Sequence, residues 1–161
     1  MQTIEGSQAV KGFRYALVVS KYNDFVTDRL QTGALAALTA AGVSSDDITV
    51  VRVPGAFEIP IVAQHVAGNG RYVAVVCLGC VIRGSTPHFE FIASAVSQGL
   101  TAAAAATGIP MMFGVLTTNS VDEALARAGE GSSNKGWEAA AAAVETAAIV
   151  SQLTRQPATK P

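Results

Sequence analysis

The stretch that decides the fold reads Gly79-Cys80-Val81-Ile82-Arg83-Gly84-Ser85-Thr86-Pro87-His88-Phe89-Glu90. An apolar run, residues 72–78, leads into it, and an Ala-rich run, residues 89–107, leads out of it. This order predicts a buried strand, a glycine-flanked turn and a helix, with Thr86 as N-cap and Pro87 at the first helical position. Because a helix start offers free N–H groups and the positive end of a dipole, the turn is suited to an anion.

The rest of the chain repeats this alternation of strand and helix. Continuous apolar segments predict strands at residues 13–20, 48–53, 72–80 and 109–117. Helical patterns lie at residues 25–41, 59–66, 89–107, 121–128 and 136–153. Strands that are apolar throughout are buried on both faces, so the pattern predicts an α/β fold with a three-layer, doubly wound, four-stranded parallel sheet. Ligands of such folds bind beyond the carboxyl ends of the strands.

The chain divides into three parts. Residues 1–12 are predicted to form an irregular N-terminal arm, and residues 13–153 a single domain. Residues 154–161 are polar with two prolines, so we expect a disordered tail.

Composition limits the class of protein. The 161 residues include only 14% charged side chains and carry a formal net charge of −1. This balance argues against nucleic acid or an anionic membrane as the main partner. No apolar run of about 18 residues and no basic leader followed by an apolar segment is present, which predicts a soluble, cytoplasmic protein. The low charge fraction with many alanines favours a surface partly covered by other subunits.

Two cysteines, Cys77 and Cys80, form a C-x-x-C spacing near the end of a predicted strand. Residues three apart in a strand point to opposite faces, whereas redox C-x-x-C pairs sit at a helix start. Zinc would need two more ligands, for which the chain offers only His65 and His88. We therefore predict that both cysteines are structural and that the protein binds no metal.

The turn at residues 79–86 fits the pattern G-x-x-x-x-G-S-T, one residue short of the nucleotide-binding P-loop. The missing residue is the lysine that would reach the outer phosphates, and no predicted strand ends in an aspartate for magnesium. A nucleotide triphosphatase is therefore disfavoured. Two interpretations stay open: a simpler phosphate site at Gly84, Ser85 and Thr86, or an ordinary turn in which Thr86 only caps the helix.

Other candidate residues follow the predicted strands. His88 lies in the first turn of the helix after the phosphate turn, where an imidazole can shuttle a proton near neutral pH; the alternative is a capping or packing role. Tyr22 and Phe57 offer ring faces to a planar ligand, and their alternative is core packing.

Three further side chains have plain structural interpretations. Arg127 ends a short helix, where a favourable contact with the helix dipole suffices as an explanation. Arg83 is a candidate for a structural ion pair. His65 lies in the second predicted helix, away from the ligand edge, and is expected to be structural.

Several segments together strongly resemble the lumazine synthase family, which makes the last precursor of riboflavin. They are Val53-Pro54-Gly55-Ala56-Phe57-Glu58-Ile59-Pro60, Leu78-Gly79, Val81-Ile82-Arg83-Gly84-Ser85-Thr86-Pro87-His88-Phe89, Phe113-Gly114-Val115-Leu116-Thr117-Thr118, Arg127-Ala128-Gly129 and Asn134-Lys135-Gly136. The resemblance runs from about Phe13 to Leu153 without large insertions. It implies a flavodoxin-like arrangement of the predicted sheet.

The resemblance also implies an activity. The family condenses 5-amino-6-(D-ribitylamino)uracil with 3,4-dihydroxy-2-butanone 4-phosphate to 6,7-dimethyl-8-ribityllumazine, releasing phosphate and water, and needs no metal or redox cofactor. The residues implied to bind the pyrimidine and its ribityl chain are Tyr22, Asn23, Ala56, Phe57, Glu58, Cys80, Val81, Ile82, Phe113 and Lys135. Gly84, Ser85, Thr86 and Arg127 would hold the phosphate, and His88 would donate and accept protons.

Finally, the resemblance implies a homo-oligomer with shared active sites, in which the adjacent subunit supplies Phe113, Arg127 and Lys135. Phe113 is predicted in mid-strand, too far from the ligand edge of its own sheet. The length of the loop at residues 130–133 matches members whose pentamers assemble into an icosahedral shell, and riboflavin synthase is a possible associate. Two alternatives remain: an archaeal-type riboflavin synthase, and a non-catalytic flavin-binding or shell-forming protein on the same scaffold.

Overall fold

The computed structural model describes residues 1–6 and 8–155. At its centre lies a four-stranded parallel sheet with the strand order β2-β1-β3-β4. The strands are β1 (Tyr15–Ser20), β2 (Ile48–Val53), β3 (Ala74–Ile82) and β4 (Met111–Thr118). Every residue of β1 is buried, because helices cover both faces of the sheet. The predicted parallel α/β sheet is thus confirmed.

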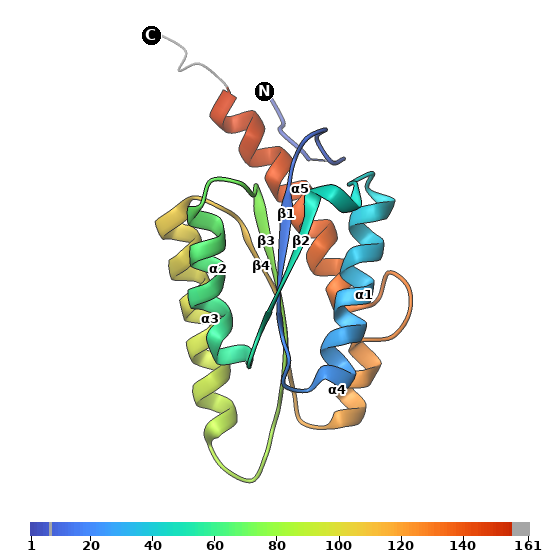
Figure 1. Ribbon diagram of the computed structural model, residues 1–161, viewed down its shortest axis with the longest axis vertical. Helices are drawn as coiled ribbons and strands as arrows, with labels where there is room; N and C mark the ends of the chain where they lie inside the picture. The colour runs from blue at the N-terminus through green and yellow to red at the C-terminus, as the bar shows by residue number, and fades with distance from the viewer. Residues whose placement is uncertain (7, 156–161) are drawn as a thin grey trace.

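The helices form two outer layers (Figure 1). On one face lie α2 (Ile59–Gly68) and α3 (His88–Thr107), and on the other lie α1 (Asp24–Ala40), α4 (Val121–Arg127) and α5 (Lys135–Arg155). Short 3₁₀ helices, η1 (Ser45–Asp47) and η2 (Ala56–Glu58), flank β2. Alternate residues of β1 enter separate buried clusters, Leu17 towards α1 and α5 and Val18 towards α2 and α3. The three-layer, doubly wound prediction is therefore confirmed.

Most element boundaries fall within two residues of the predicted ones, but the predicted N-cap of α3 is wrong. Pro87, not Thr86, precedes the first helical residue, and its carbonyl accepts hydrogen bonds from the N–H groups of Glu90 (3.2 Å) and Phe91 (3.4 Å). A carbonyl that accepts the first intrahelical bonds marks the N-cap residue, so the helix begins at His88. By contrast, α4 has a side-chain cap, because the Ser120 hydroxyl accepts from the Glu123 N–H at 3.1 Å.

The two ends of the chain also differ in part from expectation. Helix α5 continues to Arg155, so the tail begins later than predicted, and its remaining residues, 156–161, lie outside the described part. The N-terminal arm has no helix or strand within residues 1–6 and 8–12. It lies against α5, where the Gln152 side-chain amide donates to the Glu5 carbonyl oxygen at 2.8 Å. None of the helices in the described residues is both long and apolar enough to cross a membrane.

Both cysteines are free thiols buried in β3, on opposite faces of the sheet as their spacing predicts. Cys77 faces α2 and α3, whereas Cys80 faces α1 and α5. Burial raises the pKa of the Cys80 thiol to about 11, and burial also raises the pKa of Cys77. Neither thiol is therefore disposed to react as a thiolate near neutral pH.

The start of α5 is tied to α1 by the buried side chain of Asn134. Its oxygen accepts from the N–H groups of Gly136 (2.8 Å) and Trp137 (3.3 Å). Its amide nitrogen donates to the carbonyl oxygens of Arg29 (3.1 Å) and Gly129 (2.7 Å). A single buried amide thus caps one helix and holds it against another.

Gly136 lies so close to α1 that it has no room for a side chain. A Cβ atom there would come within 2.7 Å of the Leu30 carbonyl carbon and 2.9 Å of its Cα. We expect Gly136→Ala to lower the free energy of unfolding by about 3 kcal/mol or more, because two backbones must separate. Urea unfolding followed by circular dichroism measures the loss.

Gly68→Ala is the matched control for this clash. A Cβ on Gly68, the last residue of α2, meets no atom within 4 Å. Its stability should stay the same or rise slightly, because alanine is the better helix former. Equal unfolding midpoints for Gly136→Ala and the unsubstituted protein would contradict the predicted clash.

Candidate active site

A cavity of about 690 Å³ opens at the carboxyl ends of β1, β2 and β3; it is called the main cavity below. This is the edge at which the sequence predicted a ligand. The predicted site residues that line it are Tyr22, Asn23, Ala56, Phe57, Glu58, Cys80, Val81, Ile82, Gly84, Thr86 and His88. Ser85 lies between two of these lining residues. Segments that are far apart in the sequence therefore meet at one place.

Two aromatic rings stand at the main cavity rather than in the core. The side chains of Tyr22 and Phe57 are 73% and 58% exposed, so core packing is wrong for both. Tyr22 follows the end of β1, and Phe57 belongs to η2 after β2. Exposed rings next to a cavity offer flat apolar faces to a planar ligand.

Backbone hydrogen bonds at this edge join the end of β1 to the end of β2 but not to the end of β3. The N–H groups of Lys21 and Tyr22 donate to the carbonyl oxygens of Val53 (2.8 Å) and Pro54 (3.0 Å), which fixes the end of β1 to the end of β2. Pairing of β1 with β3 ends earlier, at Leu78, so residues 79–82 extend beyond it.

The Asn23 side chain occupies the space that β1 leaves beside the end of β3. Its amide nitrogen donates to the Cys80 carbonyl oxygen at 2.9 Å. Asn23 itself has φ 59°, a left-handed conformation that asparagine tolerates better than most residues. One side-chain amide N–H of Asn23 is thus used in a hydrogen bond within the wall of the main cavity.

The turn at residues 83–87 borders the main cavity and is exposed throughout. Within the described residues, the hydroxyls of Ser85 and Thr86 form no side-chain hydrogen bond, and α3 has no side-chain cap. The interpretation in which Thr86 only caps the helix is therefore wrong. The first N–H groups of a helix lack intrahelical partners, so this turn combines two hydroxyls with free backbone donors.

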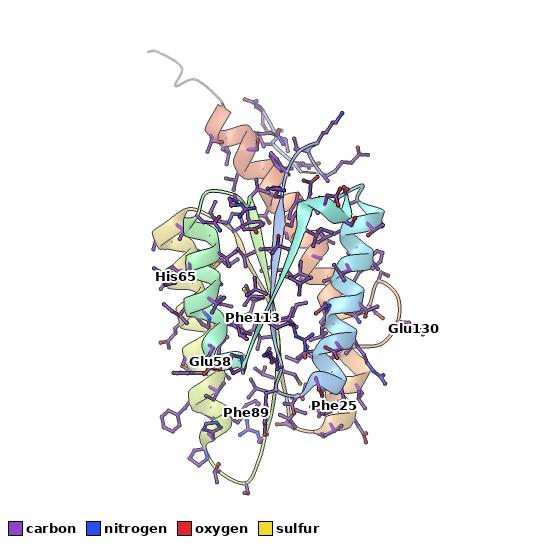
Figure 2. All side chains as sticks on the ribbon, viewed as in Figure 1. Phe25, Glu58, His65, Phe89, Phe113 and Glu130 are labelled. Carbon is purple, nitrogen blue, oxygen red and sulfur yellow. The ribbon has the colours of Figure 1, made fainter. Side chains whose placement is uncertain are left out.

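His88 is the first residue of α3, and its exposed imidazole borders the main cavity beside that turn. The other histidine, His65, is exposed on α2 and does not line the main cavity. In Figure 2, His65 lies above Glu58 and Phe89 in the same helix layer. Its Nδ1 lies 2.9 Å from the Ile61 carbonyl oxygen, a local helix contact. Only one of the two histidines is therefore placed for chemistry at this edge.

The remaining predicted residues do not join the main cavity. Phe113, Arg127 and Lys135 line a second cavity of about 400 Å³, beside β4 and the ends of α4 and α5. Phe113 pairs with Cys77 in mid-strand and is 48% exposed. The expectation that Phe113 cannot reach the ligand edge of its own sheet agrees with this placement.

The second cavity also contains a residue that the sequence did not single out. Glu138 lines it, and one of its carboxylate oxygens lies 2.7 Å from the Lys135 Nζ. The spacing of three residues on a helix was the available signal, because it brings the two side chains together. Arg127 is held in the last turn of α4, where its guanidinium donates to the Glu123 carbonyl oxygen at 3.0 Å.

The fold and these two cavities define a class. The protein is a doubly wound α/β protein with a cavity at the carboxyl edge of its sheet, where exposed aromatic rings stand beside a turn rich in hydrogen-bond donors, a lining suited to a small molecule.

Comparison with known proteins makes the class specific. A sequence model of the family described as 6,7-dimethyl-8-ribityllumazine synthase matches residues 12–151. A protein of that name from Syntrophus aciditrophicus (strain SB) is 49% identical over 149 residues, 92% of this chain and 97% of the relative. Proteins of the same name from Nitratidesulfovibrio vulgaris (strain DSM 19637 / Miyazaki F) and Desulfatibacillum aliphaticivorans are 48% and 46% identical, over 95% and 93% of this chain and 98% and 97% of theirs. The chain belongs to the 6,7-dimethyl-8-ribityllumazine synthase family.

Proposed function

We propose that the protein is a transferase that condenses 5-amino-6-(D-ribitylamino)uracil with 3,4-dihydroxy-2-butanone 4-phosphate to 6,7-dimethyl-8-ribityllumazine. Phosphate and water are the other products. The observation that carries the proposal is the main cavity, in a chain of this family: it places exposed rings, a carboxylate, a donor-rich turn and a histidine around one space.

The pyrimidine binds between the strand ends. The exposed rings of Tyr22 and Phe57 supply the flat faces on which it stacks. Ala56 and residues 80–82 line the same cavity, and their backbone groups supply hydrogen bonds to the ring. The Glu58 carboxylate accepts hydrogen bonds from the ribityl hydroxyls. Asn23 lines this part of the cavity as well.

The phosphate of the second substrate binds at Gly84, Ser85 and Thr86. The two hydroxyls and the N–H groups at the start of α3 are donors, and the helix dipole favours the negative charge. Arg127 of an adjacent subunit adds a guanidinium, which can hold two phosphate oxygens at once. Elimination of phosphate leaves negative charge on this group, and the same donors stabilise that charge.

His88 performs the proton transfers. Condensation of an amine with a ketone forms an imine and expels water, so the hydroxyl that leaves must gain a proton. Loss of phosphate and ring closure require further transfers to and from the carbon skeleton. His88 stands beside the phosphate turn, within the same cavity as the aromatic rings. Holding two substrates together supplies much of the remaining acceleration.

We infer further that the active site is shared between subunits of a homo-oligomer. Phe113, Arg127 and Lys135 line the second cavity, and Phe113 leaves an apolar ring exposed there. In the helix layer on the other face of the sheet, Ile61 of α2 and Phe91 of α3 are 55% and 71% exposed (Figure 1). An interface between two such different surfaces is heterologous, and it gives a closed ring when the rotation between neighbouring subunits closes. The family resemblance implies a ring of five subunits, a pentamer.

The pentamers are proposed to assemble into an icosahedral shell, because the short polar loop at residues 130–133 leaves α4 and α5 closely joined. Riboflavin synthase is a possible associate of such a shell, and the protein is expected in the cytoplasm. Size-exclusion chromatography with negative-stain imaging tests the assembly: a discrete hollow particle supports the shell, and a free pentamer contradicts it.

The activity is tested by mixing the purified protein with both substrates and following the absorbance of the lumazine. Rates well above the spontaneous reaction are expected. Lumazine formation at the spontaneous rate would overturn the proposal and favour a non-catalytic flavin-binding or shell protein. Riboflavin formed from lumazine alone would instead indicate an archaeal-type riboflavin synthase.

A further inference from the structure

Arg83, the first residue after β3, contacts two other segments with one side chain. Its Nε donates to the Asn119 side-chain oxygen at 2.9 Å, and Asn119 belongs to the turn between β4 and α4. Its NH1 donates to the Glu90 carboxylate, and its guanidinium carbon lies 4.3 Å from the centre of the Phe89 ring. Glu90 and Phe89 are both in the first turn of α3. Arg83 therefore bridges the end of β3, the start of α3 and the β4–α4 turn.

The turn that follows Arg83 has few other restraints. The Arg83 N–H donates to the Thr118 carbonyl oxygen at 2.8 Å, and this is the last bond that continues the β3–β4 ladder. Among the described residues, no side chain of residues 84–87 forms a hydrogen bond, and all four residues are exposed. Gly84 leaves the backbone freer still, because a glycine has no Cβ to restrict it. The Arg83 side chain is thus the main anchor of this turn.

We propose that Arg83 is a positioning residue that holds the turn of Ser85 and Thr86, and the first turn of α3 with His88, in the geometry that binds a phosphate ester. This inference rests on the proposed function. The guanidinium is given a supporting role rather than a phosphate contact, because Arg83 does not line the main cavity and its Nε and NH1 already donate to Asn119 and Glu90. It acts on the ligand through the turn, as a support for groups that touch the substrate.

Arg83 also supports phosphate binding through its charge, which pairs with Glu90. Glu90 lies two residues from His88, and a free carboxylate there would repel a phosphate. The hydrogen bond from Arg83 lowers the pKa of the Glu90 carboxyl, so the group is ionised and paired at neutral pH. The pair presents no net charge beside the phosphate turn. Loss of Arg83 would therefore both loosen the turn and expose a like charge.

The contacts continue from Arg83 towards the second cavity. The Asn119 N–H donates to a Glu123 carboxylate oxygen at 2.8 Å, and the Glu123 carbonyl oxygen accepts from Arg127 at 3.0 Å. Asn119 therefore connects Arg83 to the helix that carries Arg127. The contacts thus run in series from Arg83 through Asn119 and Glu123 to Arg127 at the second cavity.

Two variants test the proposal in the intact oligomer, Arg83→Gln and Asn119→Ala. Each should raise KM for the butanone phosphate about tenfold, because only a fraction of the turns is then in the binding geometry. Each should raise the inhibition constant for inorganic phosphate in parallel, with kcat within about twofold of the unsubstituted protein. The double variant should show no more than the larger single effect, since the contact that Asn119→Ala breaks is already lost in Arg83→Gln.

Arg14→Gln is the matched control. Arg14 and Arg83 have the same side-chain exposure, 44%, and Arg14 pairs with Asp47 at 3.5 Å before the start of β1, at the other end of the sheet. Neither KM nor phosphate inhibition should change. Equal effects in Arg14→Gln and Arg83→Gln would overturn the proposal, as would unchanged constants in Arg83→Gln, a fall in kcat alone, or additive effects in the double variant.

Two further measurements cover the remaining outcomes. If Arg83→Gln does not fold, Arg83→Lys replaces it. Lysine keeps a positive charge opposite Glu90 but loses the planar guanidinium that also reaches Asn119. An intermediate KM is therefore expected, and an unchanged KM overturns the proposal. If the unsubstituted protein forms no lumazine, the proposed function fails, and calorimetric titration with inorganic phosphate tests Arg83 separately. Weaker binding by the variants supports the proposal; equal binding, or none by the unsubstituted protein, overturns it.

Discussion

Replacing His88 by alanine is expected to lower kcat roughly 10²–10⁴-fold, the usual range for a positioned proton donor and acceptor. Both substrates should still bind with little change, because the aromatic rings and the phosphate turn stay in place. A fall in kcat at constant affinity is the signature of an interaction used mainly in the transition state. Steady-state kinetics and calorimetric titration of each substrate separate the two quantities.

The chain provides its own control for this experiment in His65, its other histidine. His65→Ala removes an exposed imidazole of α2 that does not line the main cavity, so activity should be unchanged. Full turnover in His88→Ala would remove the acid–base assignment. Equal losses in both variants would point to a general effect of histidine removal rather than to chemistry at His88.

Mixed oligomers of two inactive variants should regain activity. If each site takes His88 from one subunit and Arg127 from the next, random mixing of equal amounts of His88→Ala and Arg127→Ala restores about one quarter of the sites. Each variant alone should be nearly inactive, so the recovery is large. Co-expression with two different affinity tags, followed by tandem purification, isolates the mixed particles for the assay.

A second mixture distinguishes shared sites from complete ones. Unsubstituted subunits mixed equally with the double variant, His88→Ala with Arg127→Ala, should give about one quarter of full activity if sites are shared. They should give about one half if each subunit carries a whole site. A half-active second mixture together with a dead first mixture would show that His88 and Arg127 act in one site of the same subunit, which would overturn the shared site.

The layers of this fold could be predicted from the sequence because its strands are apolar throughout. A run such as residues 74–81 has no polar face, which only a sheet covered on both sides permits. The start of α3 was less predictable. Thr86 and Pro87 are both common near helix starts, and which of them takes the cap depends on the path of an exposed turn.

The main cavity could also be predicted in large part. The strand-end rule alone brought the segments of Tyr22, Phe57 and His88 to one edge. It could not decide whether the two rings are exposed, because an isolated aromatic residue fits the core equally well.

The second cavity was beyond the strand-end rule. Phe113 sits in mid-strand and Lys135 starts α5, so neither follows a strand end of the same subunit. Only the family resemblance predicted Phe113 and Lys135 as site residues. Neither the strand-end rule nor the family resemblance predicted Glu138, whose contact with Lys135 is seen only in the structure.

The close packing of α1 against α5 at Gly33, Asn134 and Gly136 has an evolutionary consequence. A side chain at Gly33 would run into the Asn134 amide, and a side chain at Gly136 would run into the backbone of α1. The amide in turn serves both helices at once. Gly33, Asn134 and Gly136 are therefore expected to evolve together, although about a hundred residues separate the first from the other two. A side chain at Gly33 is tolerated only with a compensating change at Asn134, so related sequences should change both positions together or neither.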